Sequence, residues 1–147
     1  IIFRPHNIYG PSMGFEHVIP EITKKIITKS NKLKNKNCEI KIQGNGSETR
    51  SFCYIEDAVT GIFLSATKGK NKEIYNIGTN QEIKITSLSK MIMTIMGTNK
   101  KIFTSIKRSG SVFRRNPDIK KINKLGFHPK YELKDGLKKT IDWYLAN

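Results

Sequence analysis

Hydrophobic positions in this chain follow two alternating patterns. In five segments they recur every three or four residues, which predicts amphipathic helices with polar outer faces. Residues typical of helix starts precede three of these segments, so we expect capping by Asp57, by Thr86 or Ser87, and by Asn116 followed by Pro117. The predicted helices span about 15–31, 57–67, 87–96, 117–125 and 132–145.

Shorter apolar runs between these helices predict β-strands. The runs at 39–43 and 48–55 flank Gly44-Asn45-Gly46-Ser47, whose residues tolerate positive φ, so we expect a hairpin there. The opening run at 1–3 breaks into an Asn/Gly/Pro loop, which is typical of a buried parallel strand that delivers a loop to a ligand crevice. With further strands at 73–77 and 101–106, the alternation predicts a small α/β domain.

Length and composition narrow the class of protein. A chain of 147 residues suits one domain with a modest core. No apolar run approaches the roughly 18 residues of a membrane span, and no signal-peptide pattern opens the chain, so we expect a soluble cytoplasmic protein without a membrane partner. Cys38 and Cys53 lack metal-ligand spacing, and we interpret both as inert packing residues and expect no metal site.

The net charge of +15, from 27 Lys+Arg against 12 Asp+Glu, raises the question of a nucleic-acid partner. The densest lysine run, at 24–41, has no interleaved aromatic residues for base stacking, so we interpret it as a solvated face and expect no nucleic-acid partner. The alternative is a stand-alone basic module that binds nucleic acid or a nucleotide-sugar without catalysis. A steep loss of nucleic-acid affinity with salt is the mark of the first version of this module.

Candidate chemistry lies in the loops. The glycine-rich phosphate signatures G-x-G-x-x-G and G-x-x-x-x-G-K-[ST] are both absent. Seven other motifs occur in a fixed order: Arg4-x-x-Asn7-x-Tyr9-Gly10-Pro11, His17-Val18-Ile19-Pro20, Gly44-x-Gly46-x-x-x-Arg50-x-Phe52-x-Tyr54-Ile55-x-Asp57, Tyr75-Asn76-Ile77-Gly78, Arg108-Ser109-Gly110, Lys124-Leu125-Gly126-Phe127-x-Pro129 and Leu133-x-x-Gly136-Leu137-x-x-Thr140-x-x-Trp143-Tyr144.

In their order and spacing these motifs resemble the carboxyl-terminal half of the NAD-dependent nucleotide-sugar epimerases and dehydratases, the extended short-chain dehydrogenase/reductase family. The resemblance implies the substrate-binding part of a Rossmann-type α/β fold, with the N-terminal NAD-binding half missing from this chain. It implies the end of a Rossmann strand and a ligand loop at 1–14, and a nucleotide-sugar binding domain at 15–147. The intact enzyme, a homodimer similar to UDP-glucose 4-epimerase, would oxidise a sugar hydroxyl with NAD and then epimerise, dehydrate or decarboxylate the keto intermediate.

The resemblance also implies roles for particular residues. Those matched to substrate contacts are Asn7, His17, Val18, Lys41, Gln43, Arg50 and Arg108, and those matched to the cofactor are Pro5 and His6. Taken singly, each has an ordinary alternative, such as a turn-forming asparagine or a solvated arginine.

The sequence departs from the family pattern in two places, which bear on the sugar preference and on catalysis. Gly110-Ser111 stands where relatives have Gly-Asp, which leaves the sugar preference open. The Tyr-x-x-x-Lys pair that moves the proton in this family is absent, and no residue here matches a catalytic role. We therefore expect this chain alone to be inactive.

Overall fold

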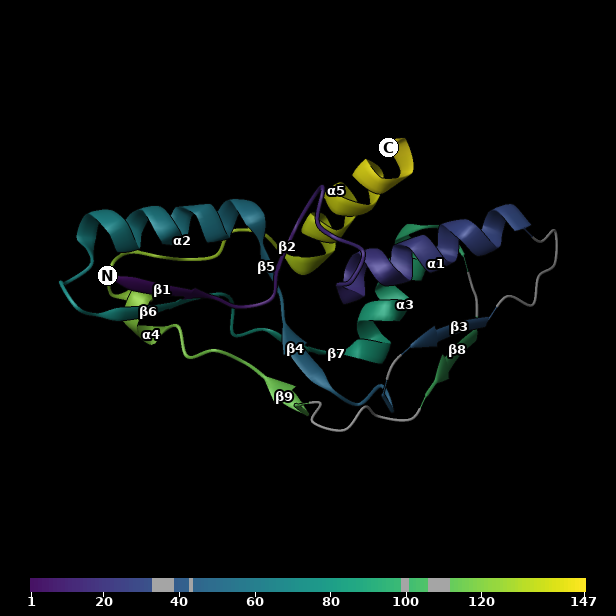
Figure 1. Cartoon of the computed structure of the whole chain (residues 1–147), viewed down its shortest axis with the longest axis horizontal. Helices are drawn as coiled ribbons and strands as arrows, with labels where there is room; N and C mark the ends of the chain where they lie inside the picture. Colours follow the sequence, from purple (N-terminus) through teal and green to yellow (C-terminus); the bar gives the residue numbers. More distant parts are fainter. Residues whose placement is uncertain (33–38, 43, 99–100, 106–111) are drawn as a thin grey trace.

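A computed structural model describes residues 1–32, 39–42, 44–98, 101–105 and 112–147 of the chain. Strands and helices alternate along it, as Figure 1 shows. The strands are β1 (Ile2–Pro5), β2 (Ile8–Tyr9), β3 (Glu39–Ile42), β4 (Thr49–Ser51), β5 (Cys53–Tyr54), β6 (Ile74–Ile77), β7 (Glu82–Lys84), β8 (Lys101–Thr104) and β9 (Arg114–Arg115). The helices are α1 (Val18–Lys32), α2 (Ile55–Lys68), α3 (Ile85–Ile95), α4 (Lys120–Asn123) and α5 (Leu133–Ala146).

The left-hand part of the molecule in Figure 1 is built around a two-stranded parallel sheet. β1 pairs with β6, with Phe3 opposite Tyr75 and Pro5 opposite Ile77, and α2 and α4 pack against the pair. α2 approaches closely at Gly61, where a Cβ would lie 2.8 Å from Ile77 Cγ2. The buried core of this part consists of Cys53, Ala58, Tyr75, Ile77, Ile119, Ile122 and Phe127.

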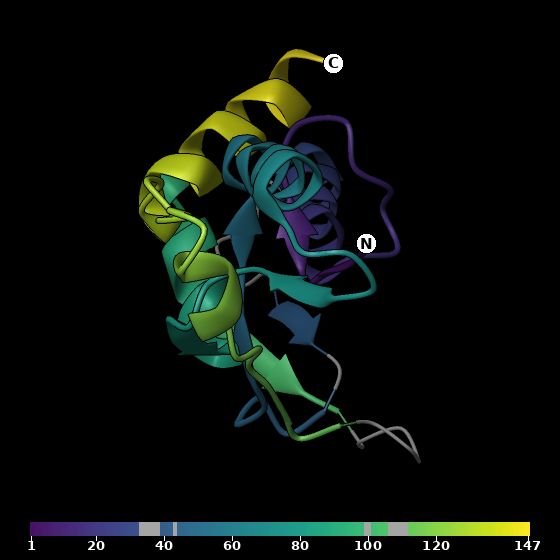
Figure 2. The ribbon, with the colours of Figure 1, turned by 90° about the vertical axis from the view of Figure 1, so that its left-hand side faces the viewer.

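The right-hand part is mainly helical. Helices α1, α3 and α5 pack on one another, and in Figure 2 α5 occupies the upper edge of the molecule. Beside them β3 pairs in parallel with β8, with Ile40 opposite Ile102. Most residues of the apolar stripes predicted for these helices are buried, but Phe15 and Leu145, which were predicted to belong to them, are 48% and 58% exposed. The main buried residues are Tyr9, Ile19, Ile22, Ile26, Ile40, Ile42, Phe52, Tyr54, Ile85, Leu88, Ile92, Met93, Leu137 and Ile141.

A three-stranded sheet lies between the two parts, with β4 at its centre. β4 pairs antiparallel with β7 and parallel with β9. Glu82 on β7 joins all three strands, because its carboxylate accepts hydrogen bonds from the Thr49 hydroxyl at 2.9 Å and the Asn116 amide at 2.8 Å, and forms an ion pair with Arg114. This sheet holds Arg50 in its central strand.

The predicted hairpin over residues 39–55 is wrong. In the described part of the chain, β3 pairs with β8 whereas β4 pairs with β7 and β9. The turn residues Gly44 and Gly46 do have the expected positive φ, +80° and +78°. However, Gly46 N–H donates to the Glu48 carboxylate and Gly46 O accepts from Thr86 N–H. The polar groups of the turn are therefore satisfied without a cross-strand ladder, and the turn joins two different sheets.

Three predicted helix starts are also corrected. α1 begins at Val18, three residues later than predicted. α3 begins at Ile85, before both predicted cap residues, and Thr86 donates its hydroxyl to Gly46 O at 3.1 Å instead of capping the helix. α4 is a single turn that begins at Lys120, four residues after Asn116, whose amide donates to Glu82.

Asp57 is not the cap of α2, which begins two residues earlier. Its buried carboxylate accepts the backbone N–H groups of Lys130 at 2.9 Å and Tyr131 at 3.0 Å, and so ties the loop before α5 to the start of α2. Because these are charge-assisted bonds in a buried site, Asp57→Ala is expected to lower the free energy of unfolding by roughly 3 kcal/mol. Urea denaturation measures the change.

The matched control for this prediction is Asp142→Ala. Asp142 forms an exposed ion pair with Lys138 one helical turn away, and such pairs contribute only about 0.5 kcal/mol. Equal midpoints and slopes for both variants would contradict the structural role of Asp57.

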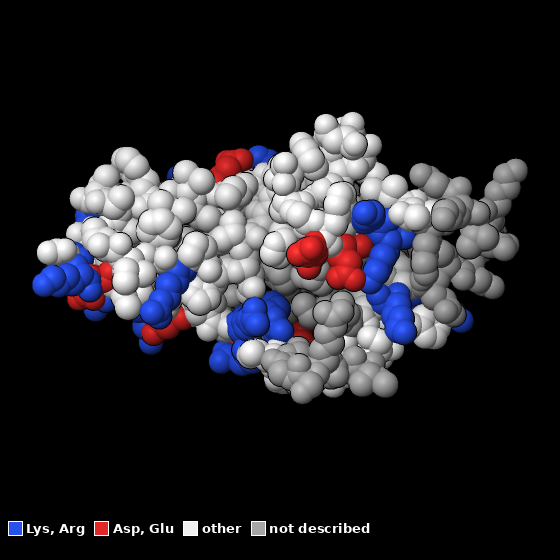
Figure 3. Space-filling view, in the orientation of Figure 1, with Lys and Arg blue, Asp and Glu red and all other residues white. Residues whose placement is uncertain are grey.

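An apolar row runs along the outside of α2. Ile55, Val59 and Phe63 follow one another at helical spacing and are 41%, 56% and 65% exposed. The side chains of Ile2 and Phe3 on β1 are also exposed. Figure 3 shows few charged side chains on this face over α2 and β1, on a chain that carries a net charge of +15. Exposed apolar patches of this kind are typical of interaction sites.

Candidate functional site

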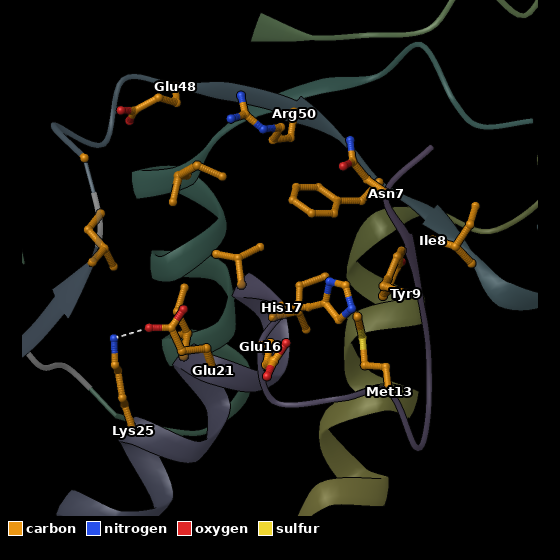
Figure 4. Close-up of a pocket in the computed structure, with 17 residues that line it drawn as sticks. Asn7, Ile8, Tyr9, Met13, Glu16, His17, Glu21, Lys25, Glu48 and Arg50 are labelled. Carbon is orange, nitrogen blue, oxygen red and sulfur yellow. Dashed lines mark hydrogen bonds and ion pairs between the residues drawn. The ribbon is translucent and has the colours of Figure 1, made fainter. Parts of the chain in front are cut away.

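A cavity of about 520 Å³ opens where the segment around β2, the start of α1 and strand β4 meet (Figure 4). Its size is that of pockets which hold small ligands. Figure 3 shows acidic side chains near the start of α1 and basic side chains near β4 and β9 on this face. The lining residues are Asn7, Ile8, Tyr9, Met13, Glu16, His17, Val18, Ile19, Glu21, Ile22, Lys25, Ile42, Gly44, Glu48, Arg50, Phe52 and Ile85.

The amino end of α1 forms one wall of the cavity. The carbonyl of His17 accepts the Glu21 N–H at 2.9 Å, so His17 stands at the cap position of the helix. The first N–H groups of a helix have no partner within it, and here they belong to Val18 and Ile19, because Pro20 has no N–H. The helix dipole makes this end favourable for an anion. His17 and Val18, which the sequence singled out, therefore line the cavity at a suitable helix end.

Arg50 reaches the cavity from the opposite wall, on β4. Its guanidinium donates to three backbone carbonyls: Nη1 to Thr49 O at 2.7 Å and Phe113 O at 3.1 Å, and Nη2 to Val112 O at 2.6 Å. These bonds hold the guanidinium plane in place. A planar, permanently charged fork in a fixed position is suited to a phosphate group.

Glu48 stands two residues before Arg50 and is only 4% exposed. One carboxylate oxygen accepts the Gly46 N–H at 3.0 Å. Gly44 makes room for the other, because a Cβ at that glycine would overlap Glu48 Oε1. Burial and then the nearby charge of Arg115 lower the pKa of Arg50, while the carboxylate of Glu48 raises it.

Asn7 lies at the bend between β1 and β2 with a φ of +45°, a conformation that asparagine tolerates better than most residues. Its Nδ2 donates to Ser51 O at 2.8 Å, and its backbone carbonyl accepts the Cys53 N–H at 3.2 Å. Asn7 therefore shapes the turn and also lines the cavity (Figure 4). Its contact with a substrate stays a prediction.

The other predicted substrate contacts, Lys41, Gln43 and Arg108, are not among the residues that line the cavity in the described part of the chain. The side chain of Lys41 is exposed on β3 and does not line the cavity, although its carbonyl accepts a hydrogen bond from Lys25 Nζ at 2.9 Å. The next residue, Ile42, does line the cavity. Gln43 and Arg108 lie outside the described residues, so their roles stay predictions.

Pro5 and His6, the predicted cofactor contacts, lie at the carboxyl end of β1, outside the lining of the cavity. His6 N–H donates to Ile77 O at 2.9 Å, and the ring Nε2 lies 3.2 Å from Asn76 Oδ1. Pro5 is exposed. The carboxyl ends of parallel strands are where α/β proteins bind cofactors, so this position is compatible with the predicted role.

Sequence reasoning missed several lining residues, above all Glu48. One signal was available, because residues two apart on a strand share a face and Glu48 stands two before Arg50. Glu16, adjacent to His17, and the Glu21–Lys25 pair, 2.5 Å apart, were missed as well. Glu21 and Lys25 lie on α1 and Glu16 lies just before it. The sequence predicted this helix but did not identify the segments that pack beside its start.

Other chemistry finds little support in the described ranges of the chain. No group of three His, Cys, Asp or Glu residues there is arranged to hold a metal ion. Burial, with a smaller contribution from Asp57, raises the pKa of the Cys53 thiol to about 12, which agrees with a packing role. Cys38 lies outside the described residues. No helix among the described residues is long and apolar enough to cross a membrane.

Comparison with protein families bears directly on this arrangement. The model of the NAD dependent epimerase/dehydratase family matches residues 1–78, more than half of the chain and most of the segments that line the cavity. The chain belongs to this family. The predicted resemblance to extended short-chain dehydrogenases/reductases is thereby confirmed.

Curated members of the epimerase/dehydratase family align along the whole chain. The dTDP-D-glucose 4,6-dehydratase of Homo sapiens is 38% identical over 154 residues, which cover 100% of this chain and 42% of that protein. GDP-L-fucose synthase 1 of Arabidopsis thaliana is 30% identical over 97% of this chain and 45% of its own length. This chain thus spans less than half the length of these relatives.

Solved structures of the family show the same fold. UDP-glucose 4-epimerase of Thermotoga maritima, crystallised with UDP-glucose, has a TM-score of 0.85 at 28% identity and covers 98% of this chain and 45% of its own. The dTDP-glucose 4,6-dehydratase DesIV of Streptomyces venezuelae, crystallised with NAD, has a TM-score of 0.87 at 28% identity, over 99% of this chain and 44% of its own. The α/β fold predicted from sequence is confirmed as part of an extended short-chain dehydrogenase/reductase fold.

Proposed function

We propose that the cavity binds the diphosphate of a nucleotide-sugar, and that the intact protein is an NAD-dependent nucleotide-sugar epimerase or dehydratase. One observation carries the proposal: Arg50, whose guanidinium is fixed by three hydrogen bonds, and Val18 and Ile19, which open the first turn of α1, line the same cavity. A diphosphate between them would meet a charged fork on one side and a helix dipole on the other.

The two ends of the cavity suit the two ends of such a ligand. Ile42 and Gly44 line the end next to β3, where we place the nucleobase, and we keep Lys41 and Gln43 as proposed contacts of that base. Asn7 lines the other end, where we place the sugar, since a carboxamide both donates and accepts hydrogen bonds. Arg108 is proposed as a second ligand of the diphosphate.

The cofactor site is proposed at the carboxyl end of β1. Pro5 and His6 would contact NAD there, which would accept a hydride from the sugar when bound. His6 is suited to a fixed contact because its ring is held next to Asn76 and its N–H is bonded to β6. Residues of this chain bind and orient the substrate, and we assign none of them the proton transfer.

The organisation of the intact protein follows as part of the same proposal. We assign residues 1–14 to the strand end and ligand loop, and residues 15–147 to the substrate-binding domain. The intact enzyme is proposed to be homodimeric and cytoplasmic. The outer apolar row of α2, formed by Ile55, Val59 and Phe63, is proposed to contact the part of the protein that its longer relatives have in addition. Most of the NAD contacts would come from that part.

Titration calorimetry of the chain tests the proposed binding. Inorganic pyrophosphate, UDP and UDP-glucose are expected to bind, and pyrophosphate should compete with UDP because both place two phosphates between Arg50 and α1. A DNA oligonucleotide of mixed sequence serves as the polyanion control. Binding of the oligonucleotide with a steep salt dependence, together with no binding of UDP, would support the basic module instead.

A further inference from the structure

Glu48, Arg50 and Phe52 form a row along β4 and its flanking residues, and all three line the cavity. Thr49, between the first two, turns the other way, because its hydroxyl donates to Glu82 at 2.9 Å. Residues two apart on a strand are separated by about 6.6 Å. The wall opposite α1 therefore presents a carboxylate, a guanidinium and an aromatic ring at regular steps, with the carboxylate at the β3 end (Figure 4).

The carboxylate of Glu48 is held in a specific place. Its Oε2 accepts the Gly46 N–H at 3.0 Å, and the missing side chain of Gly44 leaves the space that Oε1 occupies. The other acidic side chains lining the cavity differ, because Glu16 is exposed and Glu21 is paired with Lys25. Glu48 is thus a buried, positioned acceptor beside the proposed phosphate clamp.

A carboxylate at this place is unexpected in a site for an anion. An ionised carboxylate only accepts hydrogen bonds, and a diphosphate has no donors to offer at neutral pH. The group attached to a nucleoside diphosphate on its base side is the ribose, whose 2′- and 3′-hydroxyls are both donors. With the diphosphate at Arg50 and the base next to Gly44, the ribose comes to lie beside Glu48.

We propose that Glu48 accepts hydrogen bonds from the ribose hydroxyls of the nucleotide, and thereby makes the cavity selective for ribonucleoside diphosphates over their 2′-deoxy counterparts. This inference rests on the proposed function of the cavity. The contact with Glu48 would also orient the ligand, with its nucleoside toward the Gly44 turn and its sugar toward Asn7. UDP- and GDP-sugars would then be preferred to dTDP-sugars.

Calorimetric titration of the chain with UDP, 2′-deoxy-UDP and inorganic pyrophosphate tests the inference. The chain is expected to bind UDP about tenfold more tightly than 2′-deoxy-UDP, the difference of one charge-assisted hydrogen bond. In Glu48→Gln the amide oxygen still accepts the Gly46 N–H, but the charge is removed. The tenfold preference is expected to fall to about twofold or less, while pyrophosphate affinity stays equal or increases because a nearby negative charge is gone.

Glu73→Gln is the matched control, since Glu73 forms an exposed ion pair with Lys121 and does not line the cavity. It should keep the full preference for UDP. Equal affinity of the parent chain for UDP and 2′-deoxy-UDP overturns the inference, and this measurement decides even if Glu48→Gln does not fold. An unchanged preference in folded Glu48→Gln overturns it too. If neither UDP nor pyrophosphate binds the parent chain, the proposed function fails and the inference fails with it.

Discussion

Replacing Arg50 by alanine is expected to weaken the binding of UDP-glucose about ten- to a hundredfold, because a charge-assisted contact to the diphosphate is worth roughly 1.5–3 kcal/mol. Calorimetric titration of the parent and variant chains measures the effect. The same loss is expected for pyrophosphate, since the contact is to the phosphates. Arg108→Ala is expected to behave in the same way by its match to the family.

Arg50 has a second role that the experiment must separate from the first. Its guanidinium bonds the carbonyls of Val112 and Phe113, so alanine also removes a link between β4 and the segment before β9. Arg50→Lys keeps the positive charge but cannot form the planar fork, and it is expected to recover only part of the affinity. The thermal unfolding midpoint of each variant shows how much of the loss is due to stability.

Arg115→Ala is the control for charge alone. Arg115 pairs in register with Arg50 across β4 and β9, but it is exposed and does not line the cavity. Its removal is expected to change UDP-glucose affinity less than about fivefold, the range of surface charge effects. Equal affinities for the parent and Arg50→Ala would remove the diphosphate clamp from the proposal.

The second prediction with a large expected effect concerns catalytic turnover of nucleotide-sugars. This chain alone is expected to show no conversion of UDP-, GDP- or dTDP-sugars, because its 147 residues contain neither a G-x-G-x-x-G fingerprint nor a Tyr-x-x-x-Lys pair. Adding the amino-terminal half of a longer relative, such as a dTDP-glucose 4,6-dehydratase, is expected to produce NAD-dependent turnover. The measurement is the appearance of the keto or epimerised sugar by chromatography.

The apolar row of α2 provides the control for this experiment. Val59→Lys combined with Phe63→Glu places charges at two exposed positions, where surface substitutions change stability by only about 0.5 kcal/mol. These substitutions are expected to prevent the gain of turnover and to reduce binding of a hydrophobic dye to the chain. Turnover by the purified chain alone, free of contaminating enzyme, would contradict the prediction.

Much of the fold follows from local patterns in the sequence. The apolar stripes of α1, α3 and α5 have helical spacing and are mainly buried, as predicted. The stripe predicted for α2 is wrong, because Val59 and Phe63 are 56% and 65% exposed and the helix packs inward through the small residues Ala58, Gly61 and Ser65 instead. β1 and β6 lie in segments that the sequence predicted as strands. The helix ends were less predictable, because Asp57, Thr86 and Asn116 have cap chemistry but form their hydrogen bonds with distant segments.

The pairing of the central strands could not be predicted from local patterns. β2, β7 and β9 have two or three residues each, too few to show a period, and β4 exists as a strand because β7 and β9 flank it. The hairpin prediction was wrong because strand partners are set by contacts between distant segments. Local spacing does not distinguish a turn whose Gly46 N–H donates to the Glu48 side chain from a turn that closes a hairpin.

For the candidate site, too, some features follow from the sequence and others only from the tertiary structure. By itself the sequence determined the family, the amphipathic helices and the residue types suited to a diphosphate, because these depend on local order and on chemistry that each residue carries alone. Only the tertiary structure decided that Arg50 faces the amino end of α1 and that Glu48 is buried beside it, while Lys41 is exposed and does not line the cavity. Those relations depend on long-range strand pairing and helix packing, which bring together residues that no local spacing connects.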